Sequence, residues 1–235
     1  MYFLIILFLI ILLTYFLFSR HINTTSKVKS KEYSNTQKIS KQKDNNNHKY
    51  NNKAIIIDTE TTGLTNIDEF IEITAALVEF DPQGKLNVID LYTGLREPNV
   101  DINPKAQEVH NINFKMIKDK EIDYQRLYTL FDEADFLVAH NASFDRRFIL
   151  KEFKDLKDKV WLCSMNGISW RKRGFNSKGL QNLLQEHNIN TKQAHRSEAD
   201  VMALIKLLNQ EISPTNTYFN QLLKNHNISQ KDIEF

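Results

Sequence analysis

Two acidic side chains, Asp58 and Glu60, come directly after the apolar run 54–57 in the segment AIIIDTETTGL. If this run is a buried strand, residues two positions apart project from the same face, so the two carboxylates lie side by side. Like charges at that separation repel each other unless a cation lies between them. Oxygen ligands of this kind suit Mg²⁺ or Mn²⁺. The alternative interpretation is a strand end whose two acids are merely solvated.

The turn after these acids, Thr61-Thr62-Gly63, brings backbone amides close to the same place. A glycine here allows either the near approach of a ligand or a positive φ. The turn therefore favours a ligand-binding strand end over a solvated one.

A third candidate carboxylate lies in the segment 138–149, VAHNASFDRRFI. A strand is expected to end in Ala-His-Asn, and Ser143 can cap a helix that starts there. Asp145 then falls in the first turn of that helix. It either complements the helix dipole or supplies a third metal ligand at the carboxyl end of a strand, where open α/β sheets place their sites.

The segment 195–201, HRSEADV, opens the last strongly predicted helix. Ser197 and Asp200 match a pattern resembling a capping box, which needs no metal, and His195 alone could be an ordinary surface histidine. Together, His195 and Asp200 could instead be a base and a fourth carboxylate. Histidine titrates near neutrality, so it can accept a proton from a water molecule at such a site.

These side chains need a sheet that brings distant strand ends together. The segments 54–58, 71–80 and 86–93 have strand composition, and a turn at 81–85 makes the last two an antiparallel pair. The pattern that follows predicts alternating helices and strands: helices at about 123–133, 144–153, 178–187 and 197–210, with strands at 135–139 and near 160–164. We therefore expect an α/β fold with a mixed sheet flanked by helices.

The charge of the chain is unevenly distributed. The 235 residues carry a net charge of +2, but residues 19–53 hold nine basic and two acidic side chains. The basic character therefore belongs to this linker, and the whole-chain charge indicates little about a nucleic-acid footprint. The single cysteine, Cys163, excludes an internal disulfide, which fits a reducing compartment, and it is expected to pack in the core.

The N-terminal residues 2–18 are apolar except for Thr14. As a helix they would span roughly 25 Å, near the short limit for crossing a bilayer. A cleaved signal peptide is the alternative, but no basic segment precedes the run and no small-residue cleavage site follows it. We expect a single-pass anchor over 1–19 in the inner or cytoplasmic membrane. The positive charges after the run predict that the catalytic part lies on the cytoplasmic side.

Composition divides the rest of the chain into three segments. Residues 20–52 are polar and are expected to form a disordered tether, either a simple spacer or a contact for anionic lipid or a nucleic-acid backbone. The domain itself is expected over 53–212, and 213–235 is expected to be a polar tail. This tail ends in QKDIEF, which loosely resembles the peptides that bind sliding clamps.

The three segments DTETTGL, AHNASFD and HRSEAD, in this order and at these distances, resemble the motifs of the DEDDh family of 3′–5′ exonucleases. That family includes the proofreading epsilon subunit of bacterial DNA polymerase III, ribonuclease T and oligoribonuclease. The resemblance covers about residues 53–210, and a histidine five residues before Asp200 matches the histidine subclass. It implies a ribonuclease-H-like fold and removal of nucleoside 5′-monophosphates from the 3′ end of single-stranded DNA or RNA.

The resemblance also implies roles for the polar residues. Two divalent ions, Mg²⁺ or Mn²⁺, would be held by Asp58, Glu60, Asp145 and Asp200, with His195 as the general base. The competing hypothesis is a catalytically silent nucleic-acid-binding scaffold at the membrane. That scaffold would predict the loss of at least one of these residues, and all are present.

Further positions match the parts of the family that meet the substrate. The turn after the first motif would contact the 3′-terminal nucleotide, with Leu64 wedged against the last base; the matching residues are Thr61, Thr62, Gly63 and Leu64. Asn141 and Phe144 match positions that touch the substrate in the second motif. They could equally be a structural cap and a core aromatic.

Two other segments leave alternatives open. The segment 107–112, QEVHNI, resembles a family loop in which His110 would contact the substrate. Asn111 replaces the usual glycine there, and asparagine tolerates a left-handed conformation. The basic run 170–178, WRKRGFNSK, suits a single strand, which needs phosphate neutralisation and stacking surfaces, or is a solvated loop beside two half-buried aromatics.

Overall fold

The computed structural model describes residues 49–191 and 194–235, and Lys49–Phe235 form one compact unit. The predicted anchor lies outside the described residues and stays a prediction. In the part of the chain that the structure describes, no helix has both the length and the apolar character to cross a membrane. The end of the predicted tether is ordered, because Tyr50–Asn51 form strand β1 and the Tyr50 ring packs 4.9 Å from that of Phe136.

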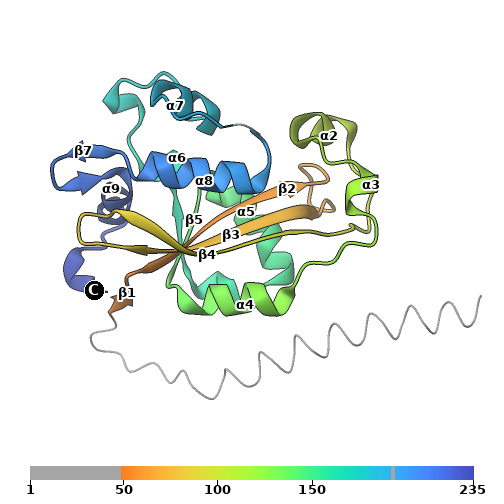
Figure 1. Ribbon diagram of the computed structural model, residues 1–235, viewed down its shortest axis with the longest axis horizontal. Helices are drawn as coiled ribbons and strands as arrows, with labels where there is room; N and C mark the ends of the chain where they lie inside the picture. The colour runs from red at the N-terminus through yellow and green to blue at the C-terminus, as the bar shows by residue number, and fades with distance from the viewer. Residues whose placement is uncertain (1–48, 192–193) are drawn as a thin grey trace, which may run out of the picture. The chain divides into compact units, whose positions relative to one another are not determined.

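A five-stranded mixed sheet, in the order β4-β3-β2-β5-β6, forms the centre of the unit (Figure 1). Strand β3 pairs antiparallel with both β2 and β4, whereas β5 pairs in parallel with both β2 and β6. Their bounds are β2 Lys53–Thr61, β3 Phe70–Phe80, β4 Leu86–Leu95, β5 Phe136–Ala139 and β6 Val160–Cys163. The predicted meander and mixed sheet are confirmed, and the arrangement fits a ribonuclease-H-like fold.

Helices cover both faces of this sheet (Figure 1). On one face lie α4 Tyr124–Glu133 and α5 Ala142–Glu152. On the other lie α7 Leu180–Glu186, α8 Ser197–Leu208 and α9 Tyr218–Asn225. The shorter elements are α2 Pro104–His110, α3 Phe114–Ile117, η1 Lys154–Asp158, α6 Ser164–Gly167, η2 Arg171–Arg173, β7 Glu211–Ser213, β8 Asn216–Thr217, η3 Gln230–Asp232 and β9 Ile233–Glu234.

The alternation of side chains along β2 assigns each residue to one of the two cores. Ala54 and Ile56 pack in the cluster that contains α8, whereas Ile55 and Ile57 pack in the cluster that contains α4 and α5. All four are fully buried, as expected for a strand covered on both faces. The same alternation continues past the apolar run, so the next even-numbered residues point toward α8 and Thr59 points toward α5.

The segment 213–235, expected as a polar tail, is part of this folded unit. Helix α9 buries Phe219, Leu222 and Leu223 in the α8 cluster, because its apolar residues gather on one face at helical spacing. Strand β9 then pairs in parallel with β1.

The clamp-like peptide is likewise occupied by its own chain. The Gln230 side chain donates a hydrogen bond to the Pro82 carbonyl, and Ile233 is buried in the core. Two of the three side chains that carry the resemblance therefore already have partners in the chain, whereas Phe235 is exposed. The described residues give the predicted clamp interaction no support.

Candidate active site

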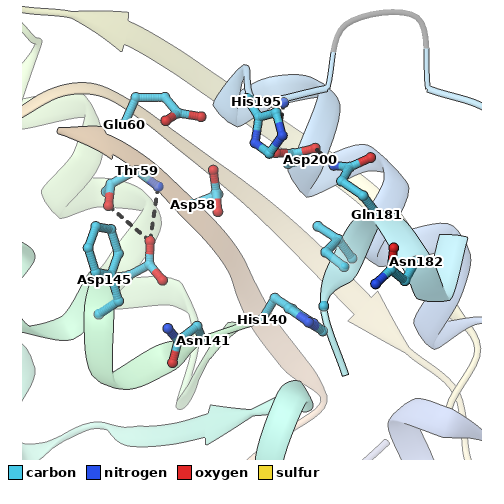
Figure 2. A pocket seen from close by; sticks show the side chains of 13 residues that line it. Asp58, Thr59, Glu60, His140, Asn141, Asp145, Gln181, Asn182, His195 and Asp200 are labelled. Carbon is cyan, nitrogen blue, oxygen red and sulfur yellow. Dashed lines mark hydrogen bonds between the residues drawn. The ribbon is translucent and has the colours of Figure 1, made fainter. Parts of the chain in front are cut away.

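A pocket of about 340 Å³ opens at the carboxyl ends of β2 and β5. Four parts of the chain line it: β2, the β5–α5 junction, the start of α7 and the start of α8 (Figure 2). The lining residues are Asp58, Thr59, Glu60, His140, Asn141, Phe144, Asp145, Gly179, Leu180, Gln181, Asn182, His195 and Asp200. All five residues predicted to be catalytic therefore meet at one pocket.

Three of the carboxylates form a compact group. Asp58, Glu60 and Asp200 each offer an oxygen, and these oxygens lie within 4.8 Å of one another. The alternation of β2 explains the meeting, since Asp58 and Glu60 point to the face covered by α8, and Asp200 lies in the first turn of that helix. Asp200 is held there by the Gln181 side-chain amide, which donates to its Oδ1 at 2.9 Å.

Asp145 reaches the pocket from the other core. It lies in the first turn of α5, as predicted, and its Oδ1 accepts hydrogen bonds from the backbone N–H of Thr59 at 3.0 Å and its hydroxyl at 2.9 Å. Ser143 is not the cap of this helix. The helix begins two residues earlier than predicted, with Asn141 at the N-cap position and the Ser143 hydroxyl donating to Asn141 Oδ1.

His195 faces the same pocket from the turn before α8 (Figure 2). Its backbone is left-handed, with φ of 61°, and its N–H donates to Asp200 Oδ2 at 3.2 Å. The capping-box interpretation of Ser197 is wrong, because α8 has no side-chain cap and the Ser197 hydroxyl bonds Thr74 Oγ1 at 2.7 Å instead.

Burial raises the pKa values of all four carboxylates, and neighbouring acids raise those of Asp58 and Glu60 further. Burial, followed by the charges of Asp200 and Glu72, raises the pKa of Glu60 to about 9. Burial raises the pKa of Asp145 to about 7, against the lowering effect of the Thr59 hydrogen bonds. The pKa values of Asp58 and Asp200 are also raised, chiefly by burial. A divalent cation would stabilise the ionised form of such clustered carboxylates, whose oxygens are the hard ligands that these cations prefer.

The turn residues shape a loop beside the pocket and are absent from its described lining. The Thr61 hydroxyl donates to the Gly63 carbonyl and the Thr62 hydroxyl to Asp68 Oδ1. A Cβ added at Gly63 would lie 2.7 Å from Asp68 Oδ1, so the glycine makes room for a carboxylate of its own loop. Leu64 is 74% exposed at the tip.

The remaining predicted contacts divide into two kinds. His110 is buried, and its Nε2 lies 3.2 Å from the Thr61 carbonyl. It therefore supports the turn from behind, and Asn111 takes the expected left-handed conformation. Asn141 and Phe144 line the pocket, and Phe144 also packs 5.1 Å from the ring of Phe148.

Sequence patterns did not assign roles to His140, Gln181 or Glu72. His140 is buried, with Nδ1 2.9 Å from Ser164 Oγ and Nε2 2.7 Å from the Lys178 carbonyl. It thereby fixes the segment that leads into α7. Its position directly after a predicted strand was the one available signal, whereas Gln181 and Glu72 make contacts that no local spacing indicates.

The basic run 170–178 does not offer two stacking surfaces. Trp170 is fully buried and its Nε1 donates to the Ser164 carbonyl, while Phe175 stacks on His187 with ring centroids 4.8 Å apart. The aromatic rings therefore face the core, and the exposed side chains of this run are those of η2 and Asn176. Cys163 is half-buried and its Sγ donates to the His140 carbonyl.

Two curated relatives share part of the chain. Over 121 residues it is 32% identical to the PolC-type DNA polymerase III of Thermotoga maritima, an alignment covering 50% of this chain and 8% of that protein. Over 160 residues it is 28% identical to the 3′–5′ exonuclease DinG of Staphylococcus aureus, an alignment covering 65% of this chain and 17% of that protein. The chain thus spans less than a fifth of the length of these relatives.

A solved structure shares the fold. Exonuclease X in complex with 5′ overhanging duplex DNA matches with a TM-score of 0.50 and 24% identity, over 73% of this chain and 98% of that chain. The exonuclease family profile matches residues 55–208, the part that holds the sheet and the pocket. This match covers well over half of the sequence, so the chain belongs to the exonuclease family.

Proposed function

We propose that this chain is a metal-dependent 3′–5′ exonuclease of the DEDDh type. The observation that carries the proposal is the grouping of oxygens from Asp58, Glu60 and Asp200 within 4.8 Å, with Asp145 and His195 lining the same pocket. Acids from one strand, β2, and two helices, α5 and α8, converge there although their burial raises their pKa values.

The donor set fits two divalent cations. Asp58, Glu60, Asp145 and Asp200 would hold Mg²⁺ or Mn²⁺, which prefer carboxylate oxygens. When bound, such ions activate the attacking water and stabilise charge on the leaving oxygen. A phosphodiester is itself an anion, so it could not approach four carboxylates without compensating positive charge.

The residues of the chain would then divide the remaining work. His195 accepts the proton of the attacking water as its oxygen bonds to phosphorus. The bond from phosphorus to the 3′ oxygen breaks, the shortened strand keeps that oxygen, and the terminal residue leaves as a nucleoside 5′-monophosphate. Asn141, Phe144 and the start of α7 form the walls that would orient the terminal nucleotide.

The substrate in this proposal is an unpaired 3′ end of DNA or RNA. The pocket is walled on several sides by separate parts of the chain (Figure 2), which suits a chain end better than a continuous duplex. Leu64, which is exposed at the loop tip, would press against the last base, as the family resemblance implies. The membrane location predicted from residues 2–18 remains part of the proposal on sequence grounds alone.

The test uses the full 235-residue chain in mild detergent, with single-stranded DNA and RNA of matched sequence labelled at the 5′ end. In Mg²⁺ or Mn²⁺ we expect a ladder of products that shorten from the 3′ end. The cleavage rates on the two strands show whether DNA or RNA is preferred. EDTA and the near-isosteric variant Asp145→Asn should abolish the ladder. Retained binding without cleavage of either strand would instead identify the silent scaffold.

A further inference from the structure

One buried charge near the pocket is not explained by metal binding. Glu72 lies within β3, its side chain is 1% exposed, and it stands directly opposite Glu60 in the β2–β3 register. Like charges directly opposite each other across two strands are destabilising. Glu72 also lies outside the group of metal-competent oxygens among the described residues. A buried acid at this position therefore needs an explanation other than metal binding.

The carboxylate of Glu72 holds the beginning of α8. The Arg196 Nε donates to both Glu72 oxygens, at 3.1 and 3.2 Å, and its Nη2 donates to Oε1. The backbone N–H of Ser197 donates to Oε2 at 2.9 Å. Because α8 has no side-chain cap of its own, Glu72 performs that role from 125 residues away.

A second set of hydrogen bonds fastens the same turn. The Ser197 hydroxyl bonds Thr74, two residues beyond Glu72 on the same face of β3, and Thr93 of β4 donates to Glu198. The first turn of α8 is therefore attached to two strands by side chains. The Arg196 side chain is 30% exposed. Its planar guanidinium donates to the carboxylate in a fixed orientation, which a lysine ammonium would not impose.

This attachment is one of two contacts that hold the backbone of His195. His195 immediately precedes Arg196 and has a left-handed backbone, so the Glu72–Arg196 contact anchors it from the C-terminal side, while its own N–H donates to Asp200 Oδ2. Asp200 depends on the pair less, because it lies inside the helix and also accepts a hydrogen bond from Gln181.

We infer that Glu72 and Arg196 are a positioning pair, which holds the base His195 over the metal-binding carboxylates without touching the reacting phosphate. This inference rests on the proposed exonuclease function for its kinetic consequence. Its structural part, that the pair orders residues 195–200, stands independently of that function.

The kinetic test compares Arg196→Gln, Glu72→Gln and Arg196→Lys with the parent chain on a single-stranded oligonucleotide. A base displaced by about 1 Å can cost about 100-fold in rate, so we expect Arg196→Gln to lower kcat by about 10- to 100-fold with KM little changed. Arg196→Lys keeps the positive charge but not the planar guanidinium, so its kcat should lie between those of the parent chain and Arg196→Gln. The matched control is Arg126→Gln, which breaks the Arg126–Asp90 ion pair between α4 and β4 and should leave kcat unchanged.

A double-mutant cycle separates positioning from general destabilisation. In a His195→Ala background, Arg196→Gln should change the residual kcat by no more than about twofold, because residues that act through one another are not additive. Equal losses in both backgrounds would overturn the inference and leave the pair a purely structural one.

Hydrogen exchange of the metal-free full chain provides a readout that does not depend on catalysis. Peptides covering 195–200 should exchange faster in Arg196→Gln and Glu72→Gln than in the parent chain or in Arg126→Gln. Unchanged exchange there would contradict the inference even if kcat fell. An inactive parent chain with the expected exchange pattern would reject the exonuclease function while retaining the positioning pair. Should the Gln variants fail to fold, Arg196→Lys carries the same comparisons.

Discussion

Thr59 donates two hydrogen bonds to a single carboxylate oxygen of Asp145, one from its backbone N–H and one from its hydroxyl, at 3.0 and 2.9 Å. Thr59 lies between Asp58 and Glu60 in β2 but points to the opposite face of the sheet. Within three consecutive residues, β2 therefore directs two acids toward α8 and holds a third acid, Asp145 of α5, by hydrogen bonds. This contact attaches α5 to the same strand that carries the two acids facing α8.

Removing the hydroxyl of Thr59 should weaken this junction. In Thr59→Val, Asp145 keeps the backbone hydrogen bond from residue 59 but loses one of the three hydrogen bonds that lower its pKa. We expect the free energy of unfolding to fall by about 1 kcal/mol and the acid limb of the pH–rate profile to move to higher pH. Thermal unfolding and rates measured from pH 5 to 9 check this, with Thr59→Ser as the control. A profile that matches that of the parent chain would contradict the assigned role.

Stability without metal should depend on pH through Glu60. Burial and nearby acids raise the pKa of Glu60 from 4.5 to about 9. Between these values the folded state binds a proton that the unfolded state has released, so the free energy of unfolding falls as pH rises. Melting temperatures measured in EDTA from pH 5 to 9 should decline across this window, and Mg²⁺ should reduce the decline.

The variant Glu60→Gln provides the matched comparison for this pH dependence. Its melting temperature should be nearly constant over the same range and should be higher than that of the parent chain at pH 8 in EDTA. The variant should nevertheless be inactive. Glu121→Gln, at an exposed position, is the control and should follow the parent chain. An undiminished decline in Glu60→Gln would assign the pH dependence to other groups.

His140 should affect substrate binding more than the chemical step. Its Nε2 is 2.7 Å from the Lys178 carbonyl, which fixes the backbone leading to the α7 wall of the pocket. Burial lowers the pKa of His140, so the ring is a neutral hydrogen-bonding group near pH 7. We expect His140→Phe to raise KM for an oligonucleotide several-fold, about the effect of losing a net 1 kcal/mol hydrogen bond, with a smaller change in kcat. His226→Phe, outside the pocket lining, should leave both constants unchanged, and a loss confined to kcat would exclude this role.

Gly63 should tolerate no side chain while Asp68 keeps its place. A Cβ at Gly63 would lie 2.7 Å from Asp68 Oδ1, and that carboxylate is already bound by Thr62 and Thr65. Gly63→Ala should therefore lower the free energy of unfolding by about 1–2 kcal/mol and raise KM by distorting the loop that carries Leu64.

The double variant Gly63→Ala/Asp68→Ala tests this cause directly. If the clash is responsible, Gly63→Ala should hardly lower the free energy of unfolding once the Asp68 carboxylate is absent, because the two sites share one contact. Denaturant unfolding of the four chains measures the coupling. Additive losses would show that the space at Gly63 serves a different purpose.

Local patterns in the sequence were sufficient for the strands, the main helices and the chemical types at the pocket. The strands expected at 71–80 and 86–93 are observed as β3 Phe70–Phe80 and β4 Leu86–Leu95, because a period of two residues is a property of neighbouring side chains. The expected carboxylates and His195 do line one pocket. The helical face of α9 was also present in the sequence, but only its burial against the α8 cluster shows that this segment belongs to the domain.

Only the tertiary structure decided which of these residues support which others. Ser197 bonds Thr74 instead of capping its own helix, Glu72 takes over the cap, and Gln181 holds Asp200. Each contact joins elements that are far apart in the chain, and none leaves a local spacing to detect. The physical reason is that periodicity sets the face on which a side chain lies, whereas its partner depends on how two covered faces of one sheet are packed.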